Sequence, residues 1–210
     1  MKLLCFDLDN TLIHSDRAHA EAYLKALSKI GYEKIPIRLI ITLFGRPKKE
    51  VAGILIGSNH KKKVEELLRW HDFYLYRTAK YTKKIKGIIS TIRKLKKRYN
   101  IAIISNCSHK HIELLLSAAN IDKDYFDLLI GYDDVKHSKP WPDEIIKAEK
   151  LMHHKASYII GDSIYDIRAG KRAHVKTIGV LTGNFNRKAL KKEKPNLIVK
   201  SVKDLNKILK

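Results

Sequence analysis

Six short segments rich in isoleucine, leucine and valine constrain the fold of this chain more than any other feature. They span residues 2–8, 101–106, 126–132, 156–163, 175–183 and 196–201. After the first, they alternate with stretches whose apolar residues recur at helical spacing, at 86–99, 109–120 and 141–154. Near-continuous apolar strands separated by helices are typical of a parallel sheet covered on both faces. We therefore expect an α/β fold with such a sheet at its core.

The region between the first two predicted strands breaks this alternation, because it contains only helical patterns. These lie at 17–31, 37–45, 48–57 and 61–81, and the first three end in a glycine, a common helix stop. A helical block inserted at this point would stand above the carboxyl ends of the strands, where the sites of parallel sheets lie. We predict a core domain of residues 1–14 and 83–210 and an inserted helical cap of residues 15–82.

The chain is strongly basic, with 43 lysines and arginines against 22 aspartates and glutamates and a formal net charge of +21. A charge of this sign suits either a nucleic-acid partner or anionic substrates. The basic runs interleave lysines with apolar residues at helical spacing, which favours the solvated faces of amphipathic helices. No basic tail, RNA-binding aromatic signature or Cys/His finger accompanies them. We therefore do not expect a nucleic-acid partner.

The sequence also indicates the cellular compartment in which the protein works. It contains no apolar stretch of about 18 residues and no signal-peptide pattern, so we expect a cytoplasmic protein without membrane contact. Two cysteines, Cys5 and Cys107, are too few for a disulfide framework. We expect both to be reduced thiols, with Cys107 a packed residue that has no role in the chemistry.

Polar residues stand where four of the predicted turns leave the sheet. They are Asp7 and Asp9, Ser105 and Asn106, Lys139, and Asp162 and Asp166. Each alone has an ordinary explanation, because aspartate often caps a helix. In a parallel sheet, however, these turns open on the same edge, which would bring four carboxylates into one crevice. Such a cluster demands protonation or a cation, and a divalent metal together with Lys139 would satisfy it. Because the donors are oxygens and no Cys/His set has zinc spacing, we expect Mg²⁺.

This ordered set of residues resembles the motifs of the haloacid dehalogenase-like hydrolase superfamily. Residues 7–11 are similar to its DxDxT pattern, Ser105 to its strand-terminal Ser/Thr, Lys139 to its lysine before proline, and residues 161–166 to its GDSxxD form. A helical cap between the first two motifs is similar to the subgroup that contains phosphoglycolate phosphatase, β-phosphoglucomutase and related sugar-phosphate phosphatases. The resemblance implies a Rossmann-like, doubly wound parallel sheet with a small inserted helical cap.

The resemblance also implies roles for the four acids. Asp7 is the nucleophile that forms an aspartyl-phosphate, and Asp9 is the general acid and then the general base. Neighbouring acids could raise the pKa of Asp9 enough for the first role, while the metal and Lys139 act against this. The Mg²⁺ ion is held by the side chain of Asp7, the backbone carbonyl of Asp9 and Asp162, with Asp166 a ligand directly or through water.

Other residues are implied to bind the substrate. Ser105 donates its hydroxyl to a phosphoryl oxygen, helped by Asn106 and the following helix, and Lys139 neutralises Asp7 and the phosphoryl group. Thr11 holds the loop after the first strand. Arg46, in the cap segment 43–53, is the candidate to contact a second anionic group of the substrate. We expect the histidines of the predicted helices to lie at the surface: His109, His111, His153 and His154.

We therefore predict a Mg²⁺-dependent phosphatase that acts on a small phosphorylated metabolite of the phosphoglycolate or sugar-phosphate type. Asp9 favours a phosphoester over a halide, because dehalogenases of this superfamily lack the second acid. A phosphomutase of the β-phosphoglucomutase type would keep the same core and stays an alternative. A nucleic-acid-end phosphatase or nucleic-acid-binding protein is suggested only by the charge, and a silent scaffold is disfavoured because no motif residue is missing. The sequence leaves open the metabolite and the choice between monomer and homodimer.

Overall fold

Six parallel strands form the central sheet of the computed structural model, which describes residues 1–33 and 35–209. The strands are β1 (Lys2–Phe6), β4 (Tyr99–Ser105), β5 (Leu128–Gly131), β6 (Ala156–Gly161), β7 (Lys176–Val180) and β8 (Leu197–Val199). Their order across the sheet is β5-β4-β1-β6-β7-β8. The strand order reverses at β1, which pairs with β4 on one side and with β6 on the other. Ligands of doubly wound sheets bind in the crevice at such a reversal, beyond the carboxyl ends of the strands.

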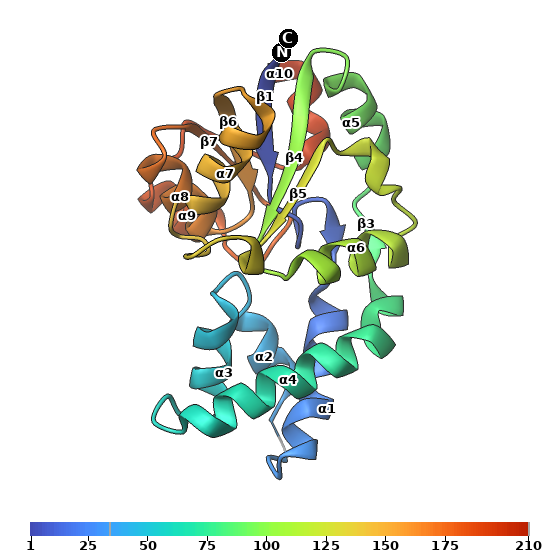
Figure 1. Ribbon diagram of the computed structural model, residues 1–210, viewed down its shortest axis with the longest axis vertical. Coiled ribbons are helices and arrows are strands. Elements are labelled where there is room, and N and C mark those ends of the chain that lie inside the picture. Colours follow the sequence, from blue (N-terminus) through green and yellow to red (C-terminus); the bar gives the residue numbers. More distant parts are fainter. Residues whose placement is uncertain (34, 210) are drawn as a thin grey trace.

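Helices cover both faces of this sheet, which confirms the predicted α/β class (Figure 1). They are α5 (Ile88–Leu95), α6 (His109–Ala118), α7 (Asp143–Met152), α8 (Ile164–Arg172), α9 (Arg187–Lys192) and α10 (Leu205–Ile208). Single-turn 3₁₀ helices lie at η1 (Ala79–Tyr81), η2 (Lys123–Tyr125), η3 (Tyr132–Asp134) and η4 (Val202–Asp204). None of the helices in the described part of the chain combines the length and hydropathy that a membrane span needs.

The apolar run of β1 is continuous because both of its faces are buried. Leu4 and Phe6 belong to a hydrophobic cluster with α5, α6 and α10, whereas Leu3 and Cys5 belong to a cluster with α7 and α8. Successive side chains of a strand point to opposite faces, so this alternation follows from strand geometry. All four side chains are inaccessible to solvent.

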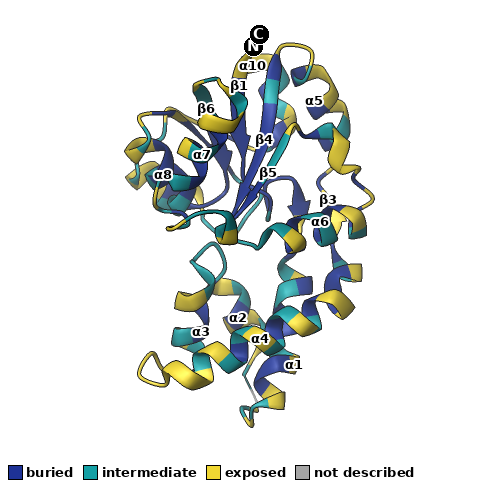
Figure 2. Cartoon of the chain, in the orientation of Figure 1, coloured by how far each residue is buried: buried dark blue, intermediate teal, exposed yellow. Residues whose placement is uncertain are grey.

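Four further helices form a separate layer beyond the carboxyl ends of the strands (Figure 1). They are α1 (Asp16–Lys29), α2 (Ile37–Thr42), α3 (Lys48–Ile56) and α4 (Lys61–Thr78). They pack around a hydrophobic cluster of their own that includes Tyr23, Ile40 and Leu67 (Figure 2). Ala18 of α1 and Leu75 of α4 instead join the cluster under the sheet, so these two helices also contact the core.

A two-stranded antiparallel ribbon connects this helical layer to the core. It consists of β2 (Ile13–His14) and β3 (Lys83–Lys84), which the sequence analysis did not find because each strand has only two residues. The ribbon lies at the predicted boundary between cap and core. The exact limits of the two domains stay a prediction, and Lys34 and Lys210, which fall within the predicted cap and core ranges, lie outside the described residues.

Close packing of α8 on the sheet depends on one glycine. A β-carbon at Gly170 would overlap the side chains of Ile159 in β6 and Thr177 in β7. The helix therefore approaches the sheet more closely than any residue with a side chain would allow. This approach fixes the position of α8, whose first turn carries Asp166.

We expect Gly170→Ala to lower the free energy of unfolding by about 1–3 kcal/mol, because the added methyl group overpacks the interface between α8 and the sheet. Urea unfolding followed by circular dichroism measures this change. Gly53→Ala is the matched control, since a β-carbon at this position in α3 meets its nearest neighbour, Ser58 Cβ, at an ordinary 3.6 Å. Alanine is the better helix former, so the control should be neutral or stabilising. Equal destabilisation by the two substitutions would contradict this account of the packing.

Candidate active site

Three buried carboxylates converge at the crevice where the strand order reverses. Asp7 follows β1, Asp162 follows β6, and Asp166 lies in the first turn of α8. Each offers a carboxylate oxygen that lies within 4.8 Å of those of the other two. Parallel strands end at the same edge of the sheet. They thus bring Asp7 next to Asp162 and Asp166, which lie more than 150 positions later in the sequence.

Lys139 neutralises part of this cluster. Its ammonium group lies 2.6 Å from Asp7 Oδ1 and 2.8 Å from Asp166 Oδ1, and it donates a third hydrogen bond to the backbone carbonyl of Ile104 at 3.1 Å. These bonds use all three ammonium donors. Burial lowers the pKa of Lys139, but the charges of Asp166 and Asp7 outweigh this effect and raise it well above its usual value. The lysine is therefore a fixed positive charge at the centre of the site.

One ammonium group does not neutralise three carboxylates. Burial raises the pKa of Asp7 to about 7, with Lys139 opposing the shift and Asp166 reinforcing it. Burial, together with the charges of Asp7 and Asp166, raises the pKa of Asp162 well above its usual value. A divalent cation would relieve this repulsion, and a set of carboxylate oxygens fits Mg²⁺.

Both carboxylate oxygens of Asp166 already accept hydrogen bonds within the protein. It accepts hydrogen bonds from the backbone N–H of Ser163 at 3.0 Å and from its hydroxyl at 2.6 Å, while Ser163 Oγ accepts one from the N–H of Asp166. This reciprocal pair is a capping box that begins α8. Because Lys139 occupies its other oxygen, Asp166 is better placed to hold a metal through water than to bind it directly. The helix-cap explanation of this aspartate therefore holds, and its role in holding a metal stays a prediction.

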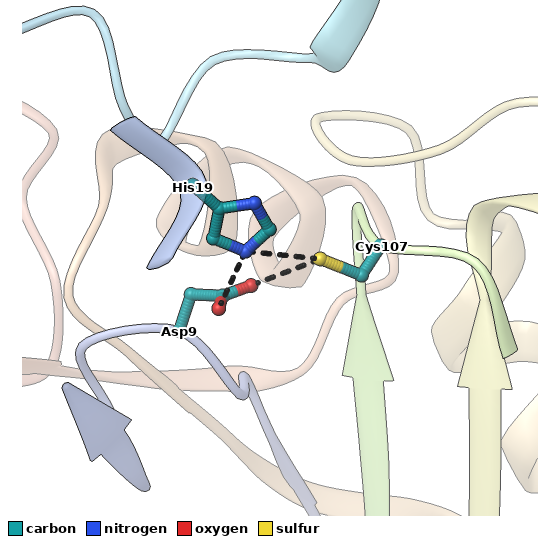
Figure 3. A group of neighbouring side chains, drawn as sticks. All are labelled: Asp9, His19 and Cys107. Atoms are coloured by element: carbon teal, nitrogen blue, oxygen red, sulfur yellow. Dashed lines mark hydrogen bonds and ion pairs between the residues drawn. The ribbon is translucent and has the colours of Figure 1, made fainter. Parts of the chain in front are cut away.

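Asp9 lies outside this group of three acids and instead faces His19 and Cys107 (Figure 3). Its Oδ1 accepts a hydrogen bond from Ser15 Oγ at 2.5 Å and lies 3.4 Å from His19 Nε2, and its Oδ2 lies 3.2 Å from Cys107 Sγ. Burial raises the pKa of Asp9, but the hydrogen bonds and the charge of His19 outweigh burial and lower it to about 2. Crowding by neighbouring acids, which could have raised the pKa of Asp9, therefore does not prevail, because hydrogen-bond donors and His19 surround this carboxylate.

The other predicted substrate ligands lie close to the same crevice. Ser105 is fully buried, and its hydroxyl accepts a hydrogen bond from the N–H of Cys107 at 3.0 Å. Asn106 Nδ2 donates to the backbone carbonyl of Lys139 at 3.3 Å, and Thr11 Oγ1 donates to Asp162 Oδ1 at 3.4 Å. Thr11 therefore supports a carboxylate of the cluster. The direct contacts of these residues with a substrate stay predictions.

A cavity of about 90 Å³ separates the cluster from the helical layer. Its walls include Asp7, Lys139 and Asp162 from the core and Phe44, Arg46 and Lys48 from the helical layer. Arg46 reaches the cavity as the sequence analysis expects, and it is anchored by Glu50 at 3.2 Å and by the carbonyls of Thr42 and Leu43, each at 3.3 Å. Lys48, which pairs with Asp72, is a second cation in this wall that the sequence analysis missed.

Three histidines of this region were also missed. His19 and His71 line the cavity, and so does His111, whose side chain is buried. The predicted surface position of His111 is therefore wrong, and burial lowers its pKa to about 4. The sequence contained one indication that His19 and Tyr23 lie together. The two residues are four positions apart on a predicted helix, so they share a face of it. Tyr23 lines the cavity as well.

A fourth acid, Glu144 of α7, lies under the site and is fully buried. Burial raises its pKa to about 8, with Lys139 opposing the shift and the charges of Asp166 and Asp7 reinforcing it. The folded protein therefore retains a proton on Glu144 at pH values where the unfolded chain, with a carboxyl pKa near 4.5, has lost it. Stability must fall as the pH rises between these two values.

We expect Glu144→Gln to remove this pH dependence, since glutamine keeps the shape and does not ionise. The free energy of unfolding of the variant, relative to that of the natural chain, should increase as the pH rises from 5 to about 7.5. The increase should be up to about 1.4 kcal/mol for each pH unit. Urea unfolding of both proteins at the two pH values measures the gain. A difference in free energy of unfolding that is the same at both pH values would contradict the buried, protonated Glu144.

Comparisons with known proteins agree with this geometry. The family model described as haloacid dehalogenase-like hydrolase matches residues 4–180. The phosphoglycolate phosphatase of Aquifex aeolicus is 30% identical over 212 aligned residues, which cover all of this chain and 97% of the relative. The pyrophosphatase PpaX of Bacillus mycoides is 27% identical over 208 residues, which cover 97% of this chain and 94% of the relative.

Solved structures show the same fold. A hydrolase from Pseudomonas syringae has a TM-score of 0.85 at 22% identity, with 100% of this chain and 98% of that one covered. A haloacid dehalogenase-like family hydrolase from Streptococcus pneumoniae has a TM-score of 0.86 at 17% identity, with 100% and 99% covered. The family model and the full-length relatives extend across both the strand-end motifs and the inserted helices. The chain therefore belongs to the haloacid dehalogenase-like hydrolase family.

Proposed function

We propose that this protein is a Mg²⁺-dependent phosphatase that hydrolyses a small phosphorylated metabolite through an aspartyl-phosphate on Asp7. The observation that carries the proposal is the buried carboxylate of Asp7, held by Lys139 beside Asp162 at the wall of a cavity. The phosphatase and pyrophosphatase names of the full-length relatives support the same class of reaction.

Asp7 is the nucleophile of the proposed first step. Lys139 binds its Oδ1, so we assign the attack on phosphorus to Oδ2. The attack forms an acyl phosphate and expels the alkoxide, and water then releases phosphate and restores the carboxylate. A Mg²⁺ ion held by the side chains of Asp7 and Asp162 and the backbone carbonyl of Asp9 would supply positive charge for the phosphoryl oxygens. Phosphoryl transfer depends mainly on such positioning and charge stabilisation.

Asp9 is the proposed proton carrier. Its low pKa suits the second step, in which a carboxylate takes a proton from the attacking water. In the first step it must deliver a proton to the leaving group.

The wall of the cavity indicates the kind of leaving group. Arg46 and Lys48 face the cavity opposite the acid cluster, so a second anionic group of the substrate would meet these two cations while the phosphoryl group meets Lys139 and the proposed Mg²⁺. Phosphoglycolate and pyrophosphate, the compounds in the names of the two relatives, share this feature. We therefore propose that the substrate is a small phosphorylated metabolite with a second anionic group.

We expect Asp7→Asn to lower turnover by at least about 10³-fold, because the amide cannot form the acyl phosphate. Phosphate release from a panel of phosphoesters, with Mg²⁺ and with a chelator, measures this loss and the metal dependence together. Asp124→Asn, an exposed aspartate of η2, is the matched control and should keep full activity. Normal turnover by Asp7→Asn, or equal turnover with the chelator, would refute the proposal. A phosphorylated product instead of free phosphate would indicate a mutase.

Arg46→Gln tests the substrate class. The variant should raise KM about tenfold for phosphoglycolate and leave KM for p-nitrophenyl phosphate, whose leaving group carries no second anion, nearly unchanged. Arg38→Gln on the exposed side of α2 serves as the control for loss of charge alone. Steady-state kinetics with both substrates give the comparison. Equal changes in KM for the two substrates would mean that Arg46 does not recognise a second anion.

A further inference from the structure

A cysteine, a histidine and an aspartate come together at the edge of the proposed active site. Asp9 follows β1, His19 lies on α1 of the helical layer, and Cys107 follows β4 (Figure 3). Each offers one ligand atom, and these atoms lie within 4.8 Å of one another. The sequence shows no Cys/His set at zinc spacing because the three positions are far apart along the chain.

The donor atoms lie near the distances of a tetrahedral zinc site. Cys107 Sγ lies 3.2 Å from Asp9 Oδ2 and 3.8 Å from His19 Nε2, and His19 Nε2 lies 3.4 Å from the other oxygen of Asp9, Oδ1. In a tetrahedron with Zn–S of about 2.3 Å and Zn–N and Zn–O of about 2.0–2.2 Å, the edges measure about 3.3–3.6 Å. A metal ion bound through one oxygen of Asp9 would therefore need a rotation of this carboxylate and a small shift of Cys107.

The hydrogen bonds behind His19 prepare its Nε2 to bind a cation. His71 is buried, and burial lowers its pKa to about 3, so its ring is neutral. His71 Nδ1 donates to Asp72 Oδ1 at 3.0 Å, which leaves Nε2 of that ring to accept from His19 Nδ1 at 3.2 Å. Nδ1 of His19 thereby has a fixed acceptor, and Nε2 is the ring nitrogen that faces Asp9 and Cys107. Histidine ligands of metals are oriented by a partner on the other ring nitrogen in the same way.

We propose that the side chains of Asp9, His19 and Cys107 form an inhibitory binding site for Zn²⁺ beside the proposed Mg²⁺ site, to which Asp9 would contribute only its backbone carbonyl. Thiolate and imidazole donors select zinc over magnesium, whereas the cluster of Asp7, Asp162 and Asp166 offers only oxygens. Three protein ligands leave a fourth position for water, and the donors line the cavity that would hold the substrate.

Binding exchanges a proton for the metal and involves no oxidation. Burial and the charge of Asp9 raise the pKa of the Cys107 thiol well above its usual value, so the metal-free residue is a thiol that donates to Asp9. On binding, the S–H bond is replaced by an S–Zn bond, and the thiol proton passes to solvent. The ion would then occupy the carboxylate of Asp9 and link α1 of the helical layer to the core. Inhibition rests on the proposed function, because it is Asp9 that moves the protons there.

Cobalt absorption tests the binding without any assay of activity. Co²⁺ added to the full-length protein in the presence of Mg²⁺ should give the near-ultraviolet charge-transfer band of a thiolate ligand at one ion per chain. Cys107→Ser and Cys107→Ala should both lose this band. Cys5→Ala, which removes a thiol buried under the sheet, and Asp162→Asn, which removes a ligand of the proposed Mg²⁺ site, should both retain it. Absence of the band in the natural chain, or its persistence in both Cys107 variants, would overturn the proposal.

Inhibition is tested on the same proteins. At saturating Mg²⁺, the Zn²⁺ concentration that halves phosphate release should be at least about tenfold higher for Cys107→Ser than for the natural chain, each measured against its own zinc-free rate. Equal sensitivity of the two proteins would show that zinc acts elsewhere. If no phosphoester is hydrolysed, the proposed function fails, and the cobalt band still decides whether the zinc site exists.

Discussion

The contact of Lys139 with Asp7 and Asp166 is the interaction on which the rest of the site depends. Three carboxylates from two different strand ends lie within 4.8 Å of one another in a buried crevice, and a single ammonium group holds two of them. Burial, reinforced by the remaining negative charge, raises the pKa values of Asp7 and Asp162. A proton or a cation that joins these acids would stabilise the fold, which supports the proposed metal site.

The helical layer completes the site from the opposite side. It brings Arg46 and Lys48 to the cavity, so the two walls carry opposite charge. It also brings His19 to Asp9, and His19 together with Ser15 and Cys107 surrounds this partly buried carboxylate. The antiparallel ribbon of β2 and β3 connects this layer to the sheet. It begins just after the motif of residues 7–11 that follows β1. Substrate recognition and proton transfer therefore both depend on how the layer sits on the core.

Much of the fold could be predicted from the sequence, because burial on both faces makes each parallel strand a nearly continuous apolar run. The six predicted strands are the six strands of the sheet, and the helical patterns of residues 17–81 form four helices. The acids at the strand ends could be placed together since parallel strands share an edge. The approach of His19 to Asp9 and Cys107, and of Lys48 to the cavity, could not be found in this way, because it depends on how the helical layer packs and not on where a strand ends. The low pKa of Asp9 and the buried position of His111 follow from the same packing.

Melting temperature measured against Mg²⁺ concentration tests the central claim most directly, because an ion that binds only the folded state stabilises it by about 2.7 kcal/mol at a hundred times its Kd. The account predicts that Mg²⁺ raises the melting temperature of the natural chain progressively and leaves Asp162→Asn, which lacks one of the converging carboxylates, almost unchanged. A natural chain whose melting temperature does not respond to Mg²⁺, or a variant that responds as strongly, would contradict it.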